Sequence, residues 1–176
     1  MPLRLNRMAS SLLRIEDIFL DQARCLGFDA SEFDAVGIHA WAGIKHRIEA
    51  AFVMAPHGTP NFSDWFDSLK GPQQCLQVSE GAVEAYLPHL LPPAERVWFV
   101  TNVRDPDHSG GVFWLFHATA RAVHAVLASG MAYHYFIVSK KYAWLLHREH
   151  HETLLGIGDI TAPMRALQQN HPLSKP

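Results

Sequence analysis

The first part of the chain carries apolar residues at helical spacing. Between residues 12 and 26 they recur every three or four positions, and polar residues fill the intervals. Ser10 or Ser11 can cap the first turn of this segment, and Gly27 is placed to end the last one. The pattern predicts an amphipathic helix.

A second amphipathic helix is predicted after Ser31 or Asp34, either of which can act as its cap. Pro56 and Gly58 end it, because proline lacks the backbone N–H that a helix interior needs. A helical turn follows over residues 64–70, in which Trp65 is either a buried anchor or an exposed contact residue. The apolar stripe of the second helix consists of Ile38, Trp41, Ile44, Ile48 and Phe52.

Short elements follow the first 70 residues, and the period of the pattern changes after Pro92 and Pro93. Residues 74–78 are typical of a short strand, and Ser79 begins a helix that Pro88 distorts or ends. Residues 96–103 and 112–116 are rich in β-branched and aromatic residues and are joined by a segment of turn formers. They predict an antiparallel hairpin with a long loop.

For the rest of the chain, the pattern predicts one helix followed by three strands. Thr119 caps an apolar helix that Gly130 closes, and a strand is predicted over residues 133–138. Residues 142–148 and 152–157 form a second hairpin that turns near residues 149–151. The apolar density on both sides of the Ser-Lys-Lys kink predicts that three side chains are buried: Trp144, Leu146 and Leu154.

Helices first and strands later predict an α+β fold. We expect N-terminal helices that pack on one face of a mixed, mainly antiparallel sheet formed by the C-terminal half. Neither an internal repeat nor a linker divides the chain, so residues 1–176 are expected to form a single domain with a polar tail from about residue 168.

Amino-acid composition and net charge limit the cellular compartment in which we expect the protein and the kinds of partner that it can bind. The 176 residues are 48% hydrophobic with a formal net charge of −2, which gives no bulk attraction for nucleic acid or an acidic membrane surface. Cys25 and Cys75 lie outside any CxxC pair, and the apolar runs are too short to cross a bilayer. We therefore expect a cytoplasmic protein. Histidines on the predicted strands, His117, His134 and His147, are expected to be buried and to make the fold less stable in acid.

The densest group of candidate metal ligands is His147, His150, His151 and Glu152. Their order matches neither HExxH nor its inverted form. In a hairpin, His147 projects from a strand while the other two histidines lie in the turn, so the three need not converge. We expect no metal ion and no cofactor. A metal-dependent enzyme built on His147, His150 and His151 is the alternative.

The run Ser139, Lys140, Lys141 suggests a serine and lysine pair for acyl transfer. The S-x-x-K spacing that turns a helical lysine toward its serine is absent, since here the lysines follow immediately. The residues favour a strand end at which both lysines enter solvent, and a basic spot that grips an acidic partner is the second interpretation.

Aromatic residues cluster on the predicted strands and could form a stacking platform for single-stranded nucleic acid. Such a platform needs interleaved basic residues, and these are sparse, so most of the rings are interpreted as core. Rings on both alternating faces also favour an interaction module. The set is Trp98, Phe99, Phe113, Trp114, Phe116, Tyr133, Tyr135, Phe136 and Trp144.

Residues 135–159, YFIVSKKYAWLLHREHHETLLGIGD, resemble an uncharacterised family of small bacterial proteins. The shared pattern is a strand, Ser-Lys-Lys-Tyr-x-Trp-Leu, polar residues, His-His, an acidic residue and an apolar strand that ends Gly-x-Gly. WFVTNV and VFWLFHAT fit the same pattern, so the likeness covers about the C-terminal half. It implies no catalytic residues. The size and the strand-rich end also look like bacterial immunity proteins of polymorphic toxin systems.

These features favour a non-enzymatic cytoplasmic module that binds another protein, in an immunity-like role that neutralises a toxin. An enzyme is the less favoured reading, and the oligomeric state is left open. The predicted binding residues are Lys140, Lys141, Tyr142, Trp144, His150 and His151.

Overall fold

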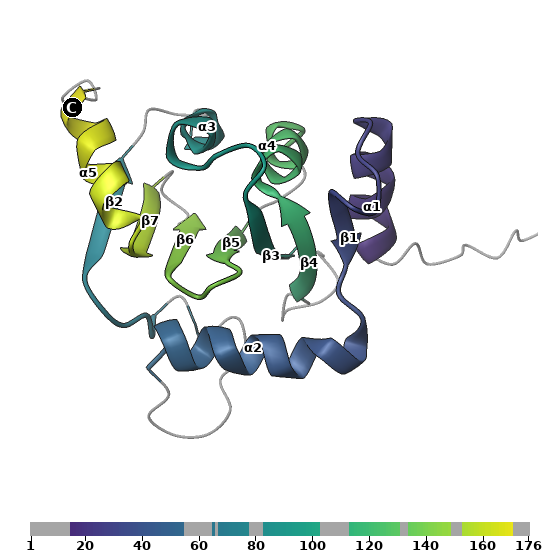
Figure 1. The fold of residues 1–176 in the computed structure, drawn as a ribbon, viewed down its shortest axis with the longest axis horizontal. Helices are drawn as coiled ribbons and strands as arrows, with labels where there is room; N and C mark the ends of the chain where they lie inside the picture. Colours follow the sequence, from purple (N-terminus) through teal and green to yellow (C-terminus); the bar gives the residue numbers. More distant parts are fainter. Residues whose placement is uncertain are drawn as a thin grey trace, which may run out of the picture.

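The protein is built around a seven-stranded sheet in the order β1-β4-β3-β5-β6-β7-β2 (Figure 1). The computed structural model describes residues 15–54, 65, 67–77, 83–102, 113–130, 134–148 and 153–170. Within these ranges every neighbouring pair of strands is antiparallel. The strands are β1 (Phe33–Ala35), β2 (Gln73–Gln77), β3 (Arg96–Asn102), β4 (Phe113–Thr119), β5 (His134–Ser139), β6 (Trp144–Arg148) and β7 (Thr153–Gly158).

Helices cover both faces of this sheet. In Figure 1, α2 runs along one face, and α3 and α4 lie on the other. The fold is α+β as predicted, but the expectation that helices cover one face is wrong, because the central strands are apolar on both sides and need cover on both. The helices are α1 (Ile15–Cys25), α2 (Ile38–Phe52), the 3₁₀ helix η2 (Val83–Tyr86), α3 (Leu87–Leu90), α4 (Ala120–Ala128) and α5 (Thr161–Asn170).

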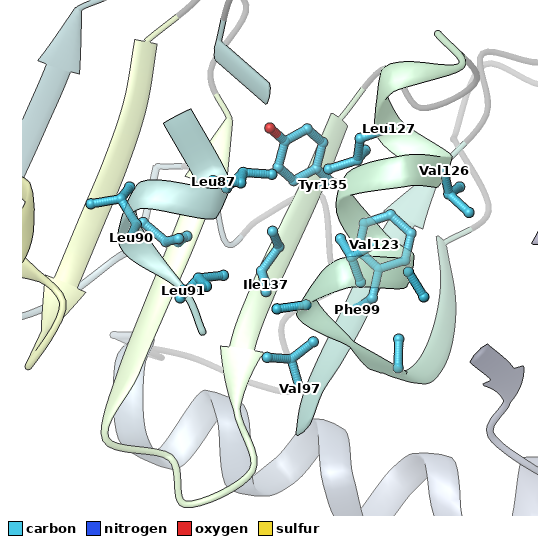
Figure 2. Packing of buried hydrophobic residues seen from close by; sticks show 14 of the residues in the cluster. Leu87, Leu90, Leu91, Val97, Phe99, Val123, Val126, Leu127, Tyr135 and Ile137 are labelled. Atoms are coloured by element: carbon cyan, nitrogen blue, oxygen red, sulfur yellow. The ribbon is translucent and has the colours of Figure 1, made fainter. Parts of the chain in front are cut away.

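The first core lies between the sheet and helices α1, α3, α4 and α5. Figure 2 shows Leu87 of α3 and Leu127 of α4 reaching toward the ring of Tyr135 in β5. Phe19 of α1 packs against Phe116 of β4, with ring centroids 5.5 Å apart. This core ties four helices to one face of the sheet.

The second core lies under α2 on the opposite face. Ile48 packs there with Trp65, which is 0% exposed and makes an edge contact with Phe136 at 5.2 Å. The indole N–H of Trp65 donates to the buried carboxylate of Glu49 at 3.0 Å, and Lys45 pairs with the same carboxylate. Trp65 is therefore a buried anchor, one of the two alternatives that its sequence context left open.

The link from β4 through α4 to β5 crosses over β3. Both strands are antiparallel to β3, so they run parallel to each other. The hydroxyl of Thr119 accepts a hydrogen bond from the Ala122 N–H at 3.3 Å, which is the predicted N-terminal cap, and Gly130 follows the helix at φ +78°. These two residues set the length of the crossover helix.

The predicted strands agree with β2 to β7 within about three residues at their ends. Trp144, Leu146 and Leu154 are buried, as expected. The assignments made for residues 1–14, 56–64, 66, 78–82, 103–112, 131–133, 149–152 and 171–176, which include the cap at Ser79, lie outside the described residues.

Two predictions about the N-terminal half are wrong. Residues 33–35 form a strand, so neither Ser31 nor Asp34 caps α2, and the cap position is Gly37. Ile38 at the start of the predicted apolar stripe is 80% exposed, because α2 meets the sheet further along, at Ile48 and Phe52.

The polar tail is also shorter than expected. Residues 161–170 form α5, which buries Met164 and Leu167 against the first core. The hydrophobic pattern that would predict this helix is weak, because only two of its ten residues are buried.

The Gly-x-Gly at the end of β7 has a packing role. A Cβ on Gly156 would lie 2.1 Å from the Met164 sulfur, so this glycine lets α5 approach the sheet. Gly158 has φ +78°, and a Cβ there would lie 2.2 Å from the Ala143 carbonyl oxygen. The next N–H, of Asp159, donates to that same oxygen at 3.1 Å.

We predict that Leu154→Ala lowers the free energy of unfolding by about 2 to 5 kcal/mol, because Leu154 is 0% exposed and the change leaves a cavity. Ile38→Ala, at an exposed position, should change it by less than about 0.5 kcal/mol. Chemical denaturation measures both. Equal effects from the two variants would contradict the assigned core.

We predict that Gly158→Ala destabilises the fold more than Gly130→Ala. Both glycines have φ +78°, so the left-handed backbone costs each alanine about 1 to 2 kcal/mol. At Gly130 the added Cβ meets nothing within 4 Å, whereas at Gly158 it meets a backbone carbonyl. Denaturation curves that show the same loss for both variants would refute the close approach of β6 and β7 at this point.

Candidate functional site

The basic turn between β5 and β6 is rigidly built. The Ser139 hydroxyl accepts a hydrogen bond from the Lys141 N–H at 3.1 Å, and the Ser139 carbonyl accepts one from the Tyr142 N–H at 2.9 Å. Tyr142 has φ 55°, a left-handed conformation that is uncommon outside glycine. Ser139 therefore stabilises this turn through both its hydroxyl and its carbonyl.

This turn borders a cleft of about 660 Å³ at one end of the sheet. We call it the sheet-end cleft. It lies where β3 and β6 begin, where β5 and β7 end, and between the end of α3 and the start of α5. Its lining residues are Leu90, Leu91, Pro92, Glu95, Arg96, Ser139, Lys140, Lys141, Ala143, Trp144, Asp159, Ile160 and Pro163.

Lys140 is half-buried at the edge of the cleft. Its Nζ lies 2.8 Å from the centroid of the Trp98 ring, in cation–π geometry. Two effects lower the pKa of Lys140 to about 7: the larger is burial of the amine, and the smaller is the positive charge of Arg96. The Trp98 ring opposes this shift, because its face favours the protonated amine.

The strand register explains this environment. His117 of β4 lies directly opposite Trp98 of β3, and Asp34 of β1 lies directly opposite His117. His117 Nε2 is 3.9 Å from the Asp34 carboxylate. Burial and the charge of Lys140 lower the pKa of His117, and the carboxylate of Asp34 partly offsets them. One row across the sheet therefore brings a carboxylate, an imidazole, an indole and an amine together.

The charges around the cleft are partly balanced. Arg96 donates a hydrogen bond to the Ser31 carbonyl at 2.6 Å, which keeps its guanidinium beside the start of β1. Lys141 is exposed, and Glu95 and Asp159 supply the two carboxylates of the lining. Three basic residues and two acidic ones thus line the cleft.

The structure brings some of the predicted binding residues together. Lys140, Lys141 and Trp144 line the cleft, whereas Tyr142 packs against the second core. His150 and His151 lie outside the described residues. Sequence reasoning missed the contributions of Leu90, Asp159 and Ile160, because no sequence signal places α3 and α5 beside the same turn.

The histidine of the alternative metal site lies away from the cleft. His147 is buried, its ring stacks on Phe136 with centroids 4.7 Å apart, and its Nδ1 lies 3.4 Å from the Tyr135 carbonyl oxygen. It is thus part of the core beneath α2. Among the described residues, no three His, Cys, Asp or Glu side chains are grouped so as to hold a metal ion.

The aromatic residues of the strands are mainly core. Phe99, Phe116, Tyr135 and Phe136 are fully buried, and Trp98 and Trp114 are partly buried. Within the described ranges, no helix is long and apolar enough to span a membrane.

At the far end of the sheet, Arg148 pairs with Glu84 of η2 at 3.2 Å. The nearby Tyr135 hydroxyl is buried, and burial raises the pKa of Tyr135 far above its ordinary value. Among the described residues, this ion pair and the buried hydroxyl lie at the end of β5 opposite the basic turn.

We predict that the melting temperature is lower at about pH 5 than at about pH 7.5, with His117 contributing. The pKa of His117 in the folded protein lies below the unfolded value of about 6.5. Its contribution to the free energy of unfolding is therefore complete above that pH and is lost as pH falls through the folded pKa. His117→Asn should reduce the difference between the two melting temperatures. An unchanged difference in this variant would contradict the assigned environment.

Two comparisons found no relative of this chain: no curated protein and no solved structure matches it. A comparison with family models found one that spans nearly the whole described region, from the start of α1 to within α5. With residues 15–168 matched, the chain belongs to a family of unknown function, DUF6756.

Proposed function

We propose that this protein is a non-enzymatic protein-binding module whose sheet-end cleft receives an acidic and apolar segment of a partner protein. The observation that carries the proposal is the clustering of three basic residues, Arg96, Lys140 and Lys141, around one cleft with apolar walls.

The walls suit an apolar side chain of the partner. Leu90, Leu91 and Ile160 are buried, and they give the cleft a rigid apolar lining, while Pro92 and Pro163 form an exposed rim. A lining that is already packed loses little side-chain entropy when a ligand binds. This arrangement supports docking of a short segment without rearrangement of the fold.

The cations suit acidic residues of the same segment. Lys141 is exposed and free to reach a partner carboxylate, and Arg96 offers a guanidinium that can bind one in two-point fashion. Glu95 and Asp159 limit the net positive charge, so they disfavour a purely polyanionic partner such as nucleic acid. The combination favours a peptide segment of mixed character.

The finer form of the proposal is an immunity-like role in the bacterial cytoplasm, in which the partner is a toxin that the protein neutralises. The chain's small size and its strand-rich C-terminal half support this form.

The test uses the protein encoded by the neighbouring reading frame as the partner. We expect Lys141→Glu and Arg96→Glu each to weaken binding at least about tenfold by calorimetry, equivalent to about 1.4 kcal/mol. Arg47→Glu, a charge reversal at an exposed position of α2, is the matched control and should bind like the parent.

A co-expression experiment separates the two parts of the proposal, which are binding to a partner protein and neutralisation of a toxin. An immunity-like protein should restore growth of cells that express the neighbouring protein, and the two cleft variants should not. Equal binding by the cleft variants and the Arg47 control would refute the cleft as the binding surface. Binding without restored growth would refute the immunity-like role.

The alternative, a metal-dependent enzyme, needs His147 to meet His150 and His151. The stacking of His147 on Phe136 disfavours it, since the ring is engaged in the core. About one zinc ion per purified chain, lost in His147→Ala and His151→Ala variants, would favour the enzyme over the binding module.

A further inference from the structure

Strand β2 ends the sheet on one side, so its outer backbone edge has no partner strand among the described residues (Figure 1). Its inner edge pairs with β7 along all five residues, Gln73–Gln77. The strand at the opposite border of the sheet, β1, has three residues and carries the charged side chain of Asp34. The two borders of the sheet therefore differ in length and in charge.

Strand β2 lacks the features that usually keep an edge strand from pairing. Natural edge strands are very short, carry charged residues or proline, or are covered by a helix or loop. The sequence of β2, Gln-Gln-Cys-Leu-Gln, contains neither a charge nor a proline. Helix α5 covers one face of the strand, where Leu76 and Met164 share the first core. On the other face, Gln73 and Cys75 are exposed.

Hydrogen bonds from side chains hold β2 in place within the single chain. The Gln74 side-chain amide donates to Oε1 of Gln168 in α5 at 3.0 Å and to the Cys75 carbonyl at 3.0 Å. The Gln73 side-chain amide donates to the Leu69 carbonyl at 3.4 Å. A strand that is already ordered loses little conformational entropy when a second strand pairs with it.

We propose that β2 pairs antiparallel with β2 of a second copy of the chain, so that the two seven-stranded sheets join into one continuous sheet. A two-fold axis at the middle residue allows all five residues to pair. Cys75 then lies opposite Cys75 of the partner subunit, and Gln73 and Gln74 lie opposite positions 77 and 76 of that subunit. This interface goes beyond the proposed function and uses a different part of the molecule.

The composition of β2 favours a second copy over a different protein. Like charges directly opposite each other destabilise a strand pair, and an uncharged strand that meets itself brings none together. The strand also offers no charge by which it could select a charged partner strand. Because five residues make a small interface, we expect a weak dimer that dissociates on dilution.

Sedimentation velocity of the full chain in a reducing buffer tests the interface. Between about 1 and about 100 µM, the parent chain should shift from monomer to dimer. Cys75→Lys places two like charges opposite each other at the axis, so it should raise the dissociation constant at least about tenfold. Cys25→Lys makes the same substitution at the exposed cysteine of α1 and should dimerise like the parent. Circular dichroism confirms that both variants are folded.

Oxidative cross-linking tests the register. Residues opposite each other in antiparallel strands have Cα atoms about 4.5 to 5.5 Å apart, which is within the range that a disulfide spans. Diamide, which takes up two electrons and two protons from each pair of thiols, should therefore link two chains rapidly. Non-reducing electrophoresis should show this product in the parent and in Cys25→Ser, but not in Cys75→Ser.

A chain that stays monomeric over the whole concentration range would overturn the proposal. A dimer that persists in Cys75→Lys, or a cross-link that forms through Cys25, would place the contact on another surface and overturn it as well. The outcome is separate from the proposed function, because Lys141→Glu in the sheet-end cleft should dimerise like the parent.

Discussion

The structure depends on the burial of β5 on both of its faces. All six residues of this strand are buried, and residues 135–138 alternate between the two cores. Tyr135 and Ile137 face α3 and α4, whereas Phe136 and Val138 face α2 and Trp65. A strand that is apolar on both sides requires a covering layer on each face of the sheet. Helix α2 covers one face, and the remaining helices cover the other.

Because helices cover both faces of the sheet, polar groups can surround a cleft at the ends of the strands. At one end of β5, the Glu84–Arg148 pair lies near the buried Tyr135 hydroxyl. At the other end, Gly158 lets the Ala143 carbonyl approach, and this contact holds β6 against the end of β7. The basic turn is thereby fixed at the mouth of the sheet-end cleft. The position of Lys140 is a consequence of how the sheet ends.

The same arrangement explains why Lys140 differs from its neighbour Lys141. The residues of β5 alternate in direction, and the register pairs Val138 with Trp98. Lys140, two positions beyond Val138, continues on the same side and lands on the indole ring, while Lys141 is exposed. Two adjacent lysines thus occupy different environments just beyond the end of one strand.

Sequence patterns predicted much of the fold because most of its elements carry a local signal. The strands from β3 to β7 have alternating or continuous apolar residues, and Thr119 and Gly130 mark the ends of α4. Residues 33–35 carry no such signal, since their strand is defined by its pairing with β4 more than 80 residues away. Helix α5 was missed because its contact with the sheet depends on the missing side chain of Gly156.

The site was less predictable than the fold. The Ser-Lys-Lys run predicted a strand end, and β5 does end at Ser139. Both lysines were expected to enter solvent, however, and the half-burial of Lys140 follows from a cross-strand register that no local pattern encodes. The most direct measurement is an NMR titration of the Lys140 side-chain amine in the intact protein. Our account predicts a midpoint near pH 7 that rises in Arg96→Gln. A midpoint near the ordinary lysine value of about 10.4 would show that the amine is solvated and would contradict the account.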